Sequence, residues 1–290
     1  MFNQNIKSPV NIPVSKIHPF EGNPYKVLDN EEMNFLIESI QQQGIISPVV
    51  VRPLENTKDE YEVISGHRRL RASQKAGLET VPAFIYAINR DEAAIMLVDS
   101  NLHREHILPS EKAFAYKLKL EAIKRQGERT DLTSDQVGRK LESAELIANK
   151  SDDSKTQVRR YIRLTYLIPE LLDLVDEKRI AFTPAVELSY LTDEEQYALL
   201  GVIEVEDRTP SLSQAVRFKK LSQTGNLFDE DIETIMQEDK ANQKPMFKVS
   251  MEKLQKVAPK IKDKDFENFV LKACEHYYRY LLRQRDRDSR

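Results

Sequence analysis

The chain has 290 residues, of which 40% are hydrophobic and 31% are charged, and its mean hydropathy is -0.55. These values are typical of a charge-rich globular protein, and no apolar run is long enough to span a membrane. The one cysteine, Cys274, excludes an intramolecular disulfide and a cysteine-based metal cluster. The N-terminus lacks the basic and then apolar pattern of an export signal, so we expect a cytoplasmic protein.

Charge is distributed unevenly, although the net charge is only -3. Residues 170–240 contain 17 acidic and 7 basic residues, which gives a net charge of -10. Residues 154–165 contain four basic residues and no acidic one, and residues 276–290 contain five arginines and two aspartates. Such segmentation suits a protein that contacts a polyanion at selected places, although a single charge run is more often a solvated helix face.

The first ninety residues alternate between strand and helix patterns. Asn30 suits the N-cap of the first predicted helix, Gly44 suits its end, and Pro13 requires an edge strand. The order strand–helix–strand–strand–helix–strand predicts a small mixed α/β domain. The strands are expected at residues 10–17, 45–52, 61–64 and 80–88, and the helices at 30–43 and 66–76.

Strand patterns stop after Asn89, and the rest of the chain is predicted to be mostly helical. Helices are expected at 91–104 and 109–126, and loops at 127–133, 151–154, 225–226 and 242–245. The predicted fold class is therefore α+β. The expected domains are a mixed α/β domain at 1–107, a helical DNA-binding domain at 108–222 and a helical C-terminal region at 223–290.

The sharpest local feature is the segment YEVISGHRRLRASQKAG, in which a strand leads through Gly66 into a helix that begins with His67, Arg68 and Arg69. The first turn of a helix has free N–H groups and partial positive charge, so arginines are unfavourable there without an anion. A phosphate fits this role, because N–H groups, guanidinium groups and a closely approachable glycine would hold it. The alternative is that these arginines pair with nearby carboxylates.

A second polar cluster, SNLHREH, occupies residues 100–106. On a continuous helix, Asn101 and Arg104 would share one face. His103 and His106 are also three residues apart, but two histidines without a third ligand are more typical of polar surface than of a metal site.

The segment SAELIANKSDDSKTQVRRYIRLTYLIPE predicts a helix-turn-helix. Ser143 suits the cap of a short helix with Leu146 and Ile147 directed inward, and Ser154 caps a second helix after a turn at 151–153. The inward side of the second helix carries Val158, Tyr161, Ile162 and Thr165. The residues expected to face DNA are Lys155, Thr156, Gln157, Arg159, Arg160 and Arg163. The alternative is an amphipathic helix with a basic outer face.

In this order, the motifs resemble the ParB family of plasmid and chromosome partition proteins. The resemblance covers roughly residues 12–191 and rests on IPVSKI…NPY, QQQGIISPVVVRP, YEVISGHRRLRA, VPAFIY, SNLHREHILPSEKAFAY and the helix-turn-helix. It implies a CTP-binding N-terminal domain, a central domain for a centromere-like duplex DNA site, a dimeric clamp on DNA and a ParA-type ATPase as partner. The sequence is also similar in style to partition proteins of mobile elements in Gram-positive bacteria.

The resemblance implies a nucleotide site made of three segments. Residues 44–48 match the segment near the cytosine base, Gly66 begins the box that usually reads GERR, and residues 100–104 match ENLxR, whose Glu and Asn serve the phosphates and a magnesium ion. No catalytic residue is implied, and Asn101 is the implied Mg²⁺ ligand. The implied nucleotide-binding residues are Gly44, Ile45, Ser47, Pro48, Gly66, His67, Arg68, Arg69, Arg71, Asn101 and Arg104.

Two carboxylates of the family pattern are absent, because His67 and Ser100 stand where glutamates are usual. Their loss leaves the attraction for phosphate intact but weakens magnesium coordination, since Mg²⁺ prefers a carboxylate. Asp99 is adjacent but lies about 100° around the helix, which makes it a poor substitute. We therefore expect CTP binding with little or no hydrolysis.

The C-terminal region contains an amphipathic helix pattern at residues 265–282. Its apolar face would belong either to a core or to a partner, and we expect it to provide the main contact of a homodimer. The preceding residues 244–264 contain seven lysines, which suit a second, sequence-independent DNA contact. The apolar face consists of Phe266, Phe269, Val270, Ala273, Tyr277 and Leu281.

A transcriptional regulator stays open beside a CTP-regulated partition protein, whereas two kinds of enzyme are disfavoured by the sequence. A transcriptional regulator would use the same helix-turn-helix with a degenerate pocket, so CTP would not change its DNA occupancy. A sulfiredoxin-like enzyme requires a cysteine beside the phosphate motif, and the cysteine here is at position 274. A metal-dependent nuclease requires clustered carboxylates near the basic pocket, where this sequence lacks them.

Overall fold

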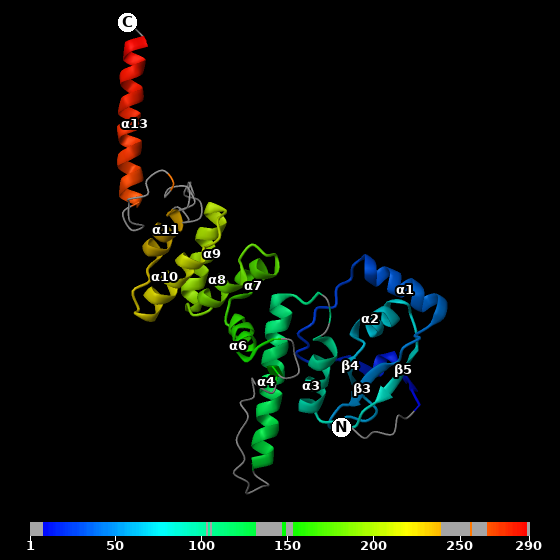
Figure 1. The fold of residues 1–290 in the computed structure, drawn as a ribbon. Coiled ribbons are helices and arrows are strands. Elements are labelled where there is room, and N and C mark those ends of the chain that lie inside the picture. Colours follow the sequence, from blue (N-terminus) through cyan, green and yellow to red (C-terminus); the bar gives the residue numbers. More distant parts are fainter. Residues whose placement is uncertain are drawn as a thin grey trace. The chain divides into compact units, whose positions relative to one another are not determined.

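The computed structural model describes residues 8–102, 104, 106–131, 147–148, 153–238, 256 and 266–288. The chain divides into two compact units, Met1–Glu238 and Asp239–Arg290. Figure 1 shows the sheet and the helices of the first unit, and the long helix α13, Phe266–Asp288, of the second.

The N-terminal part of the first unit is a five-stranded mixed sheet with the strand order β1-β5-β3-β4-β2. β1 pairs antiparallel with β5 and β3 with β4, whereas β2 pairs parallel with β4 and β3 with β5. Pro13 therefore lies on an edge strand, as predicted. The strands are β1 Val10–Pro13, β2 Ile17–Pro19, β3 Val49–Pro53, β4 Tyr61–Ser65 and β5 Thr80–Ile85.

The single strand predicted at residues 10–17 is wrong. A 3-10 turn, η1 Val14–Lys16, divides it, so that β1 and β2 lie at opposite edges of the sheet. Pro13 explains the interruption, because it lacks an N–H and has a fixed φ. The strands predicted at 45–52 and 80–88 are shorter in the structure, since β3 begins only after Pro48 and β5 ends at Ile85.

Three helices accompany the sheet: α1 Glu31–Gln43, α2 His67–Lys75 and α3 Arg90–Asn101. The side chain of Asn30 accepts the N–H of Met33 at 3.1 Å, which confirms the predicted cap of α1. The prediction that one helix carries both Asn101 and Arg104 is wrong, because α3 ends at Asn101. The N–H of Arg104 instead donates to the carbonyl oxygen of Asn101 at 3.2 Å, in a tighter turn.

The sheet separates two apolar clusters. Successive side chains of a strand point to opposite faces, and β4 shows this directly. Val63 packs with Ile12 and Leu70 on one side, while Ile64 packs on the other side with Leu97 of α3. This second cluster also includes alanines of α4, Pro109–Asp131, so the sheet and the helical part are joined by packing.

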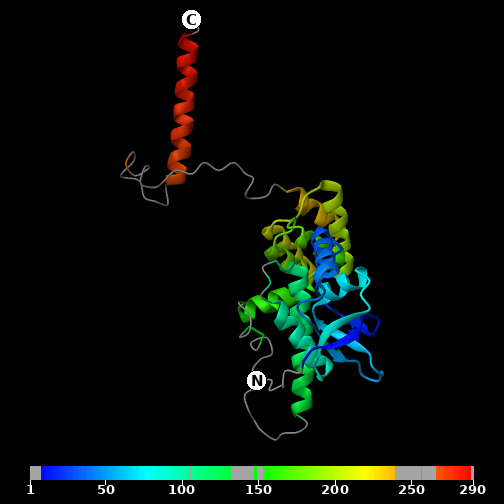
Figure 2. The ribbon, with the colours of Figure 1, turned by 90° about the vertical axis from the view of Figure 1, so that its right-hand side faces the viewer.

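Helix α4 contacts α3 on one side and α6 and α7 on the other, and in Figure 1 it lies between the sheet and the later helices. Figure 2 views the same unit from the side of the sheet. The loop predicted at residues 127–133 is wrong for residues 127–131, because α4 continues to Asp131. One apolar core extends from Ala113 through Phe218 to Met236, past the expected boundary at residue 222. Within the described residues, this unit also contains the helices α6 Lys155–Leu164, α7 Pro169–Asp176, α8 Phe182–Leu188, α9 Asp193–Glu206, α10 Leu212–Gln223 and α11 Asp229–Gln237.

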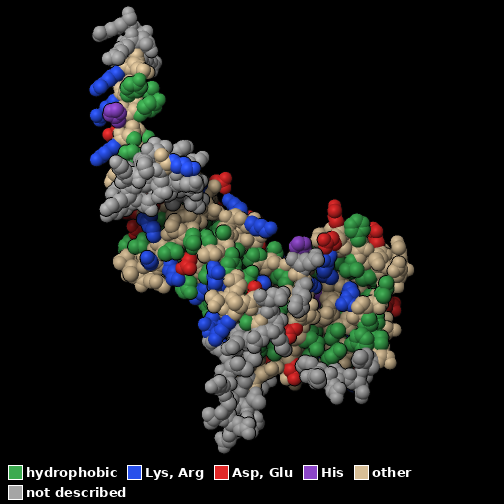
Figure 3. Space-filling view, in the orientation of Figure 1, with side chains coloured by type: hydrophobic (Ala, Val, Ile, Leu, Met, Phe, Trp, Pro, Cys, Tyr) green, Lys and Arg blue, Asp and Glu red, His purple; other side chains and the backbone are tan. Residues whose placement is uncertain are grey.

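Helix α13 shows two chemically different sides. Figure 3 shows Lys, Arg and His side chains along one side and hydrophobic side chains along the other. Tyr277 is 61% exposed and Leu281 is 43% exposed, so the apolar side is not part of a core within the described residues. No described helix combines the length and the apolar character that crossing a membrane requires.

Candidate functional site

Gly66 forms a cradle between β4 and α2. It caps α2 with a φ of 99°, a left-handed conformation that favours glycine. A Cβ at this position would lie 2.9 Å from Cγ1 of Val49 and 3.1 Å from Nη2 of Arg69. Because Gly66 has no side chain, Val49 and Arg69 can lie close to the backbone at the first turn of α2. The predicted phosphate site also needs an accessible backbone at this turn.

Arg69 ties the start of α2 to the predicted cytosine loop. Its Nη1 donates to the carbonyl oxygens of Ser47 and of Pro48, the latter at 2.8 Å. Burial lowers the pKa of Arg69. The structure thus holds Ser47 and Pro48, from the predicted cytosine segment, at the side chain of Arg69 in the first turn of α2.

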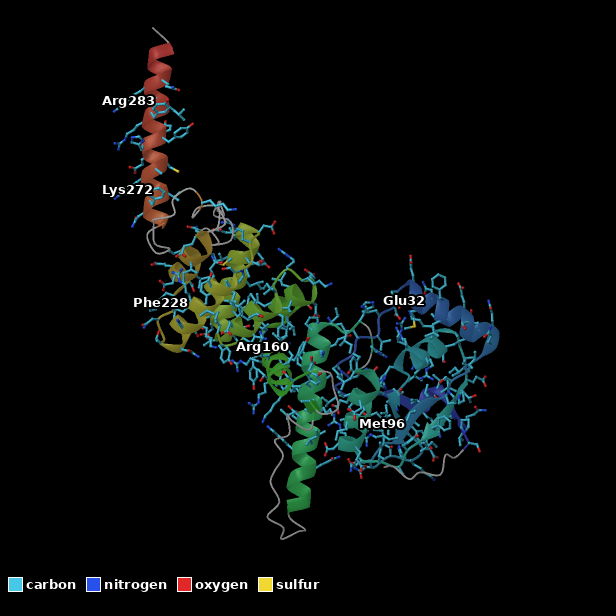
Figure 4. The ribbon with its side chains drawn as sticks, in the orientation of Figure 1. Glu32, Met96, Arg160, Phe228, Lys272 and Arg283 are labelled. Carbon is cyan, nitrogen blue, oxygen red and sulfur yellow. The ribbon has the colours of Figure 1, made fainter. Side chains whose placement is uncertain are left out.

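Arg68 and Arg71 pair with carboxylates. Nη2 of Arg68 lies 3.0 Å from Oε2 of Glu32 on α1 (Figure 4 labels Glu32), and Nη2 of Arg71 lies 3.0 Å from Oδ2 of Asp29. Hydrogen bonds from Arg71 and then from Lys75 lower the pKa of Asp29 to about 2. The alternative expectation, that basic residues at this helix start have carboxylate partners, therefore holds for these two arginines.

His67 places an imidazole at the same helix start. Among the described residues, its buried Nε2 has no hydrogen-bond partner. Burial, and then the charge of Arg104, lower the pKa of His67 to about 4, so the ring is neutral near pH 7. The guanidinium of Arg104 lies 5.5 Å from the ring centre of Tyr25, whose buried hydroxyl also has no partner among the described residues. These polar atoms are suited to a polar ligand.

Asn101 is buried at the end of α3, where its Nδ2 donates to the carbonyl oxygen of Leu97 at 2.7 Å. Ser100 lies beside it, and Asp99 forms an ion pair with the buried Lys119. The described residues contain no group of three or more His, Cys, Asp or Glu side chains placed to hold a metal ion. Because Mg²⁺ prefers a carboxylate ligand, the residues around Asn101 do not fit a Mg²⁺ ion.

The second helix of the predicted helix-turn-helix is α6. Oγ of Ser154 accepts the N–H of Gln157 at 3.2 Å, which confirms the predicted cap. Ile147 lies in a helical turn and is buried with Val158, as predicted. The expectations for Ser143, Leu146 and residues 149–152 fall outside the described residues, as do His103 and most of residues 244–264.

Helix α4 positions the start of α6. The hydroxyl of Tyr116 donates to Oδ2 of Asp153 at 2.6 Å, and Nζ of Lys112 lies 2.6 Å from the same oxygen. Lys112 also lies over the ring of Tyr161 at 4.8 Å. These contacts hold the residue before the cap of α6 in place, so the orientation of the helix follows from packing on α4.

The six predicted DNA-facing residues differ in exposure. Thr156 and Arg159 are exposed, while the other four are half-buried. Nη2 of Arg160 donates to Oγ1 of Thr183 at 2.9 Å, and Nε of Arg163 donates to Oγ of Ser189 at 3.1 Å (Figure 4 labels Arg160). Arg160 therefore joins α6 to α8, and Arg163 joins α6 to Ser189, which caps the end of α8.

Sequence reasoning missed the residues that link these sites. The backbone N–H of Lys26 donates to Oε1 of Glu111 at 2.8 Å, and the side-chain Nζ of Lys26 lies 3.7 Å from Oδ1 of Asp173. Lys117 and Lys219 approach tyrosine rings beside Arg163. No motif marks these residues, because their partners are distant in the sequence.

The comparisons with known proteins identify the family. Residues 3–102 match the model of the ParB N-terminal domain. The chain is 31% identical over 206 residues to the chromosome-partitioning protein Spo0J of Thermus thermophilus, with 71% of this chain and 68% of the relative covered. This chain belongs to the ParB family. It is also 32% identical to the nucleoid occlusion protein of Listeria innocua, where it spans 64% of the relative's length and the match covers 69% of this chain.

Two solved structures of another ParB protein resemble this chain. One is the C-terminally truncated ParB of Caulobacter crescentus complexed to the centromeric parS site, with 21% identity, a TM-score of 0.43, and coverage of 78% of this chain and 98% of that one. The other is the truncated protein complexed with CTP-gamma-S, with 24% identity, a TM-score of 0.32, and coverage of 68% and 99%.

Proposed function

We propose that this chain is a site-specific DNA-binding partition protein that binds CTP and acts as a dimeric clamp at a centromere-like site. The observation that carries the proposal is that one compact unit of this ParB-family chain contains both the Gly66 cradle and the capped basic helix α6. Helix α4 packs against both α3 and α6. A ligand at the first site and DNA at the second would thus act on the same helix.

The nucleotide is proposed to place its phosphates at the first turn of α2, where free N–H groups attract anions. Arg69 holds residues 44–48 at the cradle, and Arg68 and Arg71 would exchange carboxylate partners for phosphate oxygens. Arg104 adds charge beside His67. Because Ser100 and His67 provide no carboxylate, we propose little or no CTP hydrolysis.

The DNA contact is proposed to be α6, with its first turn in the major groove. Lys155, Thr156 and Gln157 would read base edges, and Arg159 would contact phosphates. The amide of Gln157 suits adenine. This assignment is supported by the cap at Ser154, which fixes the first turn, and by the exposure of Thr156.

The dimer contact is proposed to lie on the apolar side of α13, where exposed tyrosines and leucines gather. Two copies of a helix-turn-helix bind more tightly than one when a two-fold-related site is available. Truncation before residue 265 should therefore yield a folded monomer that binds CTP but binds DNA poorly. Light scattering that shows a truncated dimer would place the interface elsewhere.

Membership of the ParB family supports two further parts of the proposal. A ParA-type ATPase is the proposed partner, and the nucleoid or a plasmid is the proposed location. Pull-down of a ParA-type ATPase from the host by the full-length protein, with and without CTP, would test the partner directly.

The decisive experiment measures DNA occupancy with and without CTP. Duplexes selected from a random library by the full-length protein supply the site, and calorimetry supplies the CTP affinity. We expect CTP to bind at micromolar concentration and to change the occupancy of the selected duplex. Binding of DNA that is unaffected by CTP would favour the transcriptional regulator. Absence of selected DNA binding would refute the proposed function.

A further inference from the structure

Five side chains from separate parts of the first unit form an alternating series of cations and aromatic rings. Nζ of Lys219 lies 3.7 Å from the ring centre of Tyr190, and the guanidinium carbon of Arg163 lies 4.0 Å from the same ring. Arg163 also lies 4.4 Å from the ring of Tyr166, and Nζ of Lys117 lies 5.7 Å from that ring. We call this series, Lys219–Tyr190–Arg163–Tyr166–Lys117, the cation ladder.

The ladder preserves positive charge while ordering the side chains that carry it. A cation is attracted to the face of an aromatic ring, and unlike an ion pair this contact leaves the charge of the cation uncompensated. Ordered side chains also lose less entropy when they bind a ligand. Among the described residues, Glu187 is the carboxylate seen to pair with a ladder cation, at 2.9 Å from Nζ of Lys219. The ladder therefore presents a net positive surface.

The ladder lies at the end of α6 opposite to the predicted base-reading turn. Thr156 and Gln157 occupy the first turn of α6, while Arg163 occupies the last. A recognition helix contacts base edges with its N-terminal residues, and the surrounding elements reach the sugar-phosphate backbone. Tyr166 is 55% exposed and Tyr190 is 39% exposed, so both rings are accessible. Figure 3 shows Lys and Arg side chains on the surface of this helical part.

We infer that the cation ladder is a second DNA contact, which binds phosphates of the duplex beside the segment that α6 reads. This inference rests on the proposed function, since it requires α6 to enter the major groove. It changes the role of Arg163, whose Nε and Nη2 both donate to Ser189. Arg163 contacts the sugar-phosphate backbone of the duplex and keeps both tyrosine rings in place, and it does not read bases.

A phosphate contact has a specific thermodynamic signature. Each lost contact reduces the slope of log affinity against log salt by about one unit, and it weakens binding to all sequences alike. Lys117→Ala and Lys219→Ala should each weaken binding roughly five- to tenfold at 0.1 M salt, equally on the selected duplex and on a random duplex. The double variant should lower the slope by about two units.

Lys220 provides the matched control, because it follows Lys219 on α10 but is exposed and has no ladder contact among the described residues. Lys220→Ala removes the same charge and should leave the slope unchanged. An equal effect of Lys219→Ala and Lys220→Ala would overturn the ladder in favour of general electrostatic attraction.

Tyr190 provides a second test that leaves the charge of the protein unchanged. Tyr190→Leu removes the ring shared by Lys219 and Arg163 and should weaken binding to both duplexes, whereas Tyr190→Phe keeps the ring and should bind nearly as the parent does. Thermal unfolding checks that the variants fold. If Tyr190→Leu does not fold, the Lys117→Ala and Lys219→Ala variants decide the question.

The outcomes separate this inference from the proposed function. If Gln157→Ala weakens the selected duplex while the double lysine variant retains the parent slope, the ladder inference is wrong and the proposed function stands. If the parent protein binds no duplex, the proposed function itself fails.

Discussion

Arginines begin α2 and line α6, but their neighbours differ in kind. On α2, Arg68 and Arg71 contact the carboxylates of Glu32 and Asp29. On α6, Arg163 contacts two tyrosine rings and Ser189, and no carboxylate of the described residues forms an ion pair with it. An anion at Arg68 or Arg71 must therefore displace a carboxylate, whereas an anion at Arg163 meets a guanidinium group that forms no ion pair with a described carboxylate. This difference suits an exchangeable small ligand at α2 and a polyanion at α6.

The cost of that exchange is small. The side chain of Glu32 is 72% exposed and that of Asp29 is 39% exposed, and an ion pair at the surface adds little to stability. A triphosphate provides several oxygens for the same guanidinium groups, and hydrogen bonds to charged groups contribute about 1.5–3 kcal/mol each. The carboxylates thus hold the arginines near the cradle without preventing phosphate from replacing them.

The largest expected effect belongs to the backbone of the α2 site. Gly66→Ala places a Cβ 2.9 Å from Cγ1 of Val49 at a φ of 99°. We expect a loss of about 3 kcal/mol in the free energy of unfolding, from strain and overpacking together, and loss of measurable CTP binding. Urea unfolding and calorimetry measure the two effects.

Gly77→Ala is the matched control, since Gly77 has a φ of 75° but a Cβ there would meet nothing within 4 Å. It should cost only the conformational strain, about 1 kcal/mol, and keep CTP binding. Equal effects of the two substitutions would show that close approach at Gly66 is irrelevant.

His67 should make the first unit sensitive to acid. Its pKa is about 4 in the folded protein and 6.5 when unperturbed, so the unfolded chain binds the extra proton between these values. Stability is therefore present above pH 6.5 and is lost as the pH falls toward 4. We expect about 2 kcal/mol less stability at pH 5 than at pH 7 from this group.

His67→Gln should remove that part of the pH dependence, while His106→Gln, at an exposed position, should retain it. Urea unfolding of the three proteins at both pH values provides the measurement. A His67→Gln variant with the full pH dependence of the parent would assign the effect to other groups.

Arg68→Ala tests whether an arginine of α2 changes partners. We expect a loss of roughly 1.5 kcal/mol in CTP binding, near the lower limit for a hydrogen bond to a charged group, because Arg68 must first leave Glu32. Arg90→Ala removes an arginine that pairs with Glu21 at 3.1 Å away from the cradle, and it should leave CTP affinity unchanged. Unchanged calorimetric affinity in a folded Arg68→Ala variant would remove Arg68 from the site.

Local sequence signals predicted much of this molecule. The cap residues Asn30 and Ser154 act through contacts three residues away, so the sequence alone reveals them. Gly66 was recognisable because a glycine followed by basic residues at a strand–helix junction is typical of an anion-binding helix start. The α/β order and the burial of Val158 on α6 followed from periodicity, whereas the second buried residue of α6, Leu164, was not among the residues predicted to face inward.

Long-range features were not predictable in this way. Pro13 divides the predicted strand into β1 and β2, which lie at opposite edges of the sheet. This arrangement follows from the pairing of β1 with β5 and of β2 with β4. The partners of Arg163 include Tyr190, which belongs to no local motif. The end of α3 at Asn101 was missed because the helix propensity of the following residues is adequate, and a tighter turn at Arg104 overrides it. Tertiary contacts decided the strand pairing and the partners of Arg163, and a local turn decided the end of α3.

The smallest expected effect is also the most direct test of the contrast between α2 and α6. Glu32→Gln keeps the shape of the side chain but releases Arg68, so CTP should bind two- to threefold more tightly, about 0.5 kcal/mol. Glu31→Gln, one residue away and without an ion pair among the described residues, is the control for the loss of one negative charge. Glu187→Gln frees Lys219 and should instead strengthen duplex binding by a similar factor without changing CTP affinity. If Glu31→Gln and Glu32→Gln tighten CTP binding equally, long-range charge explains the gain, and the paired carboxylate on α1 does not compete with phosphate.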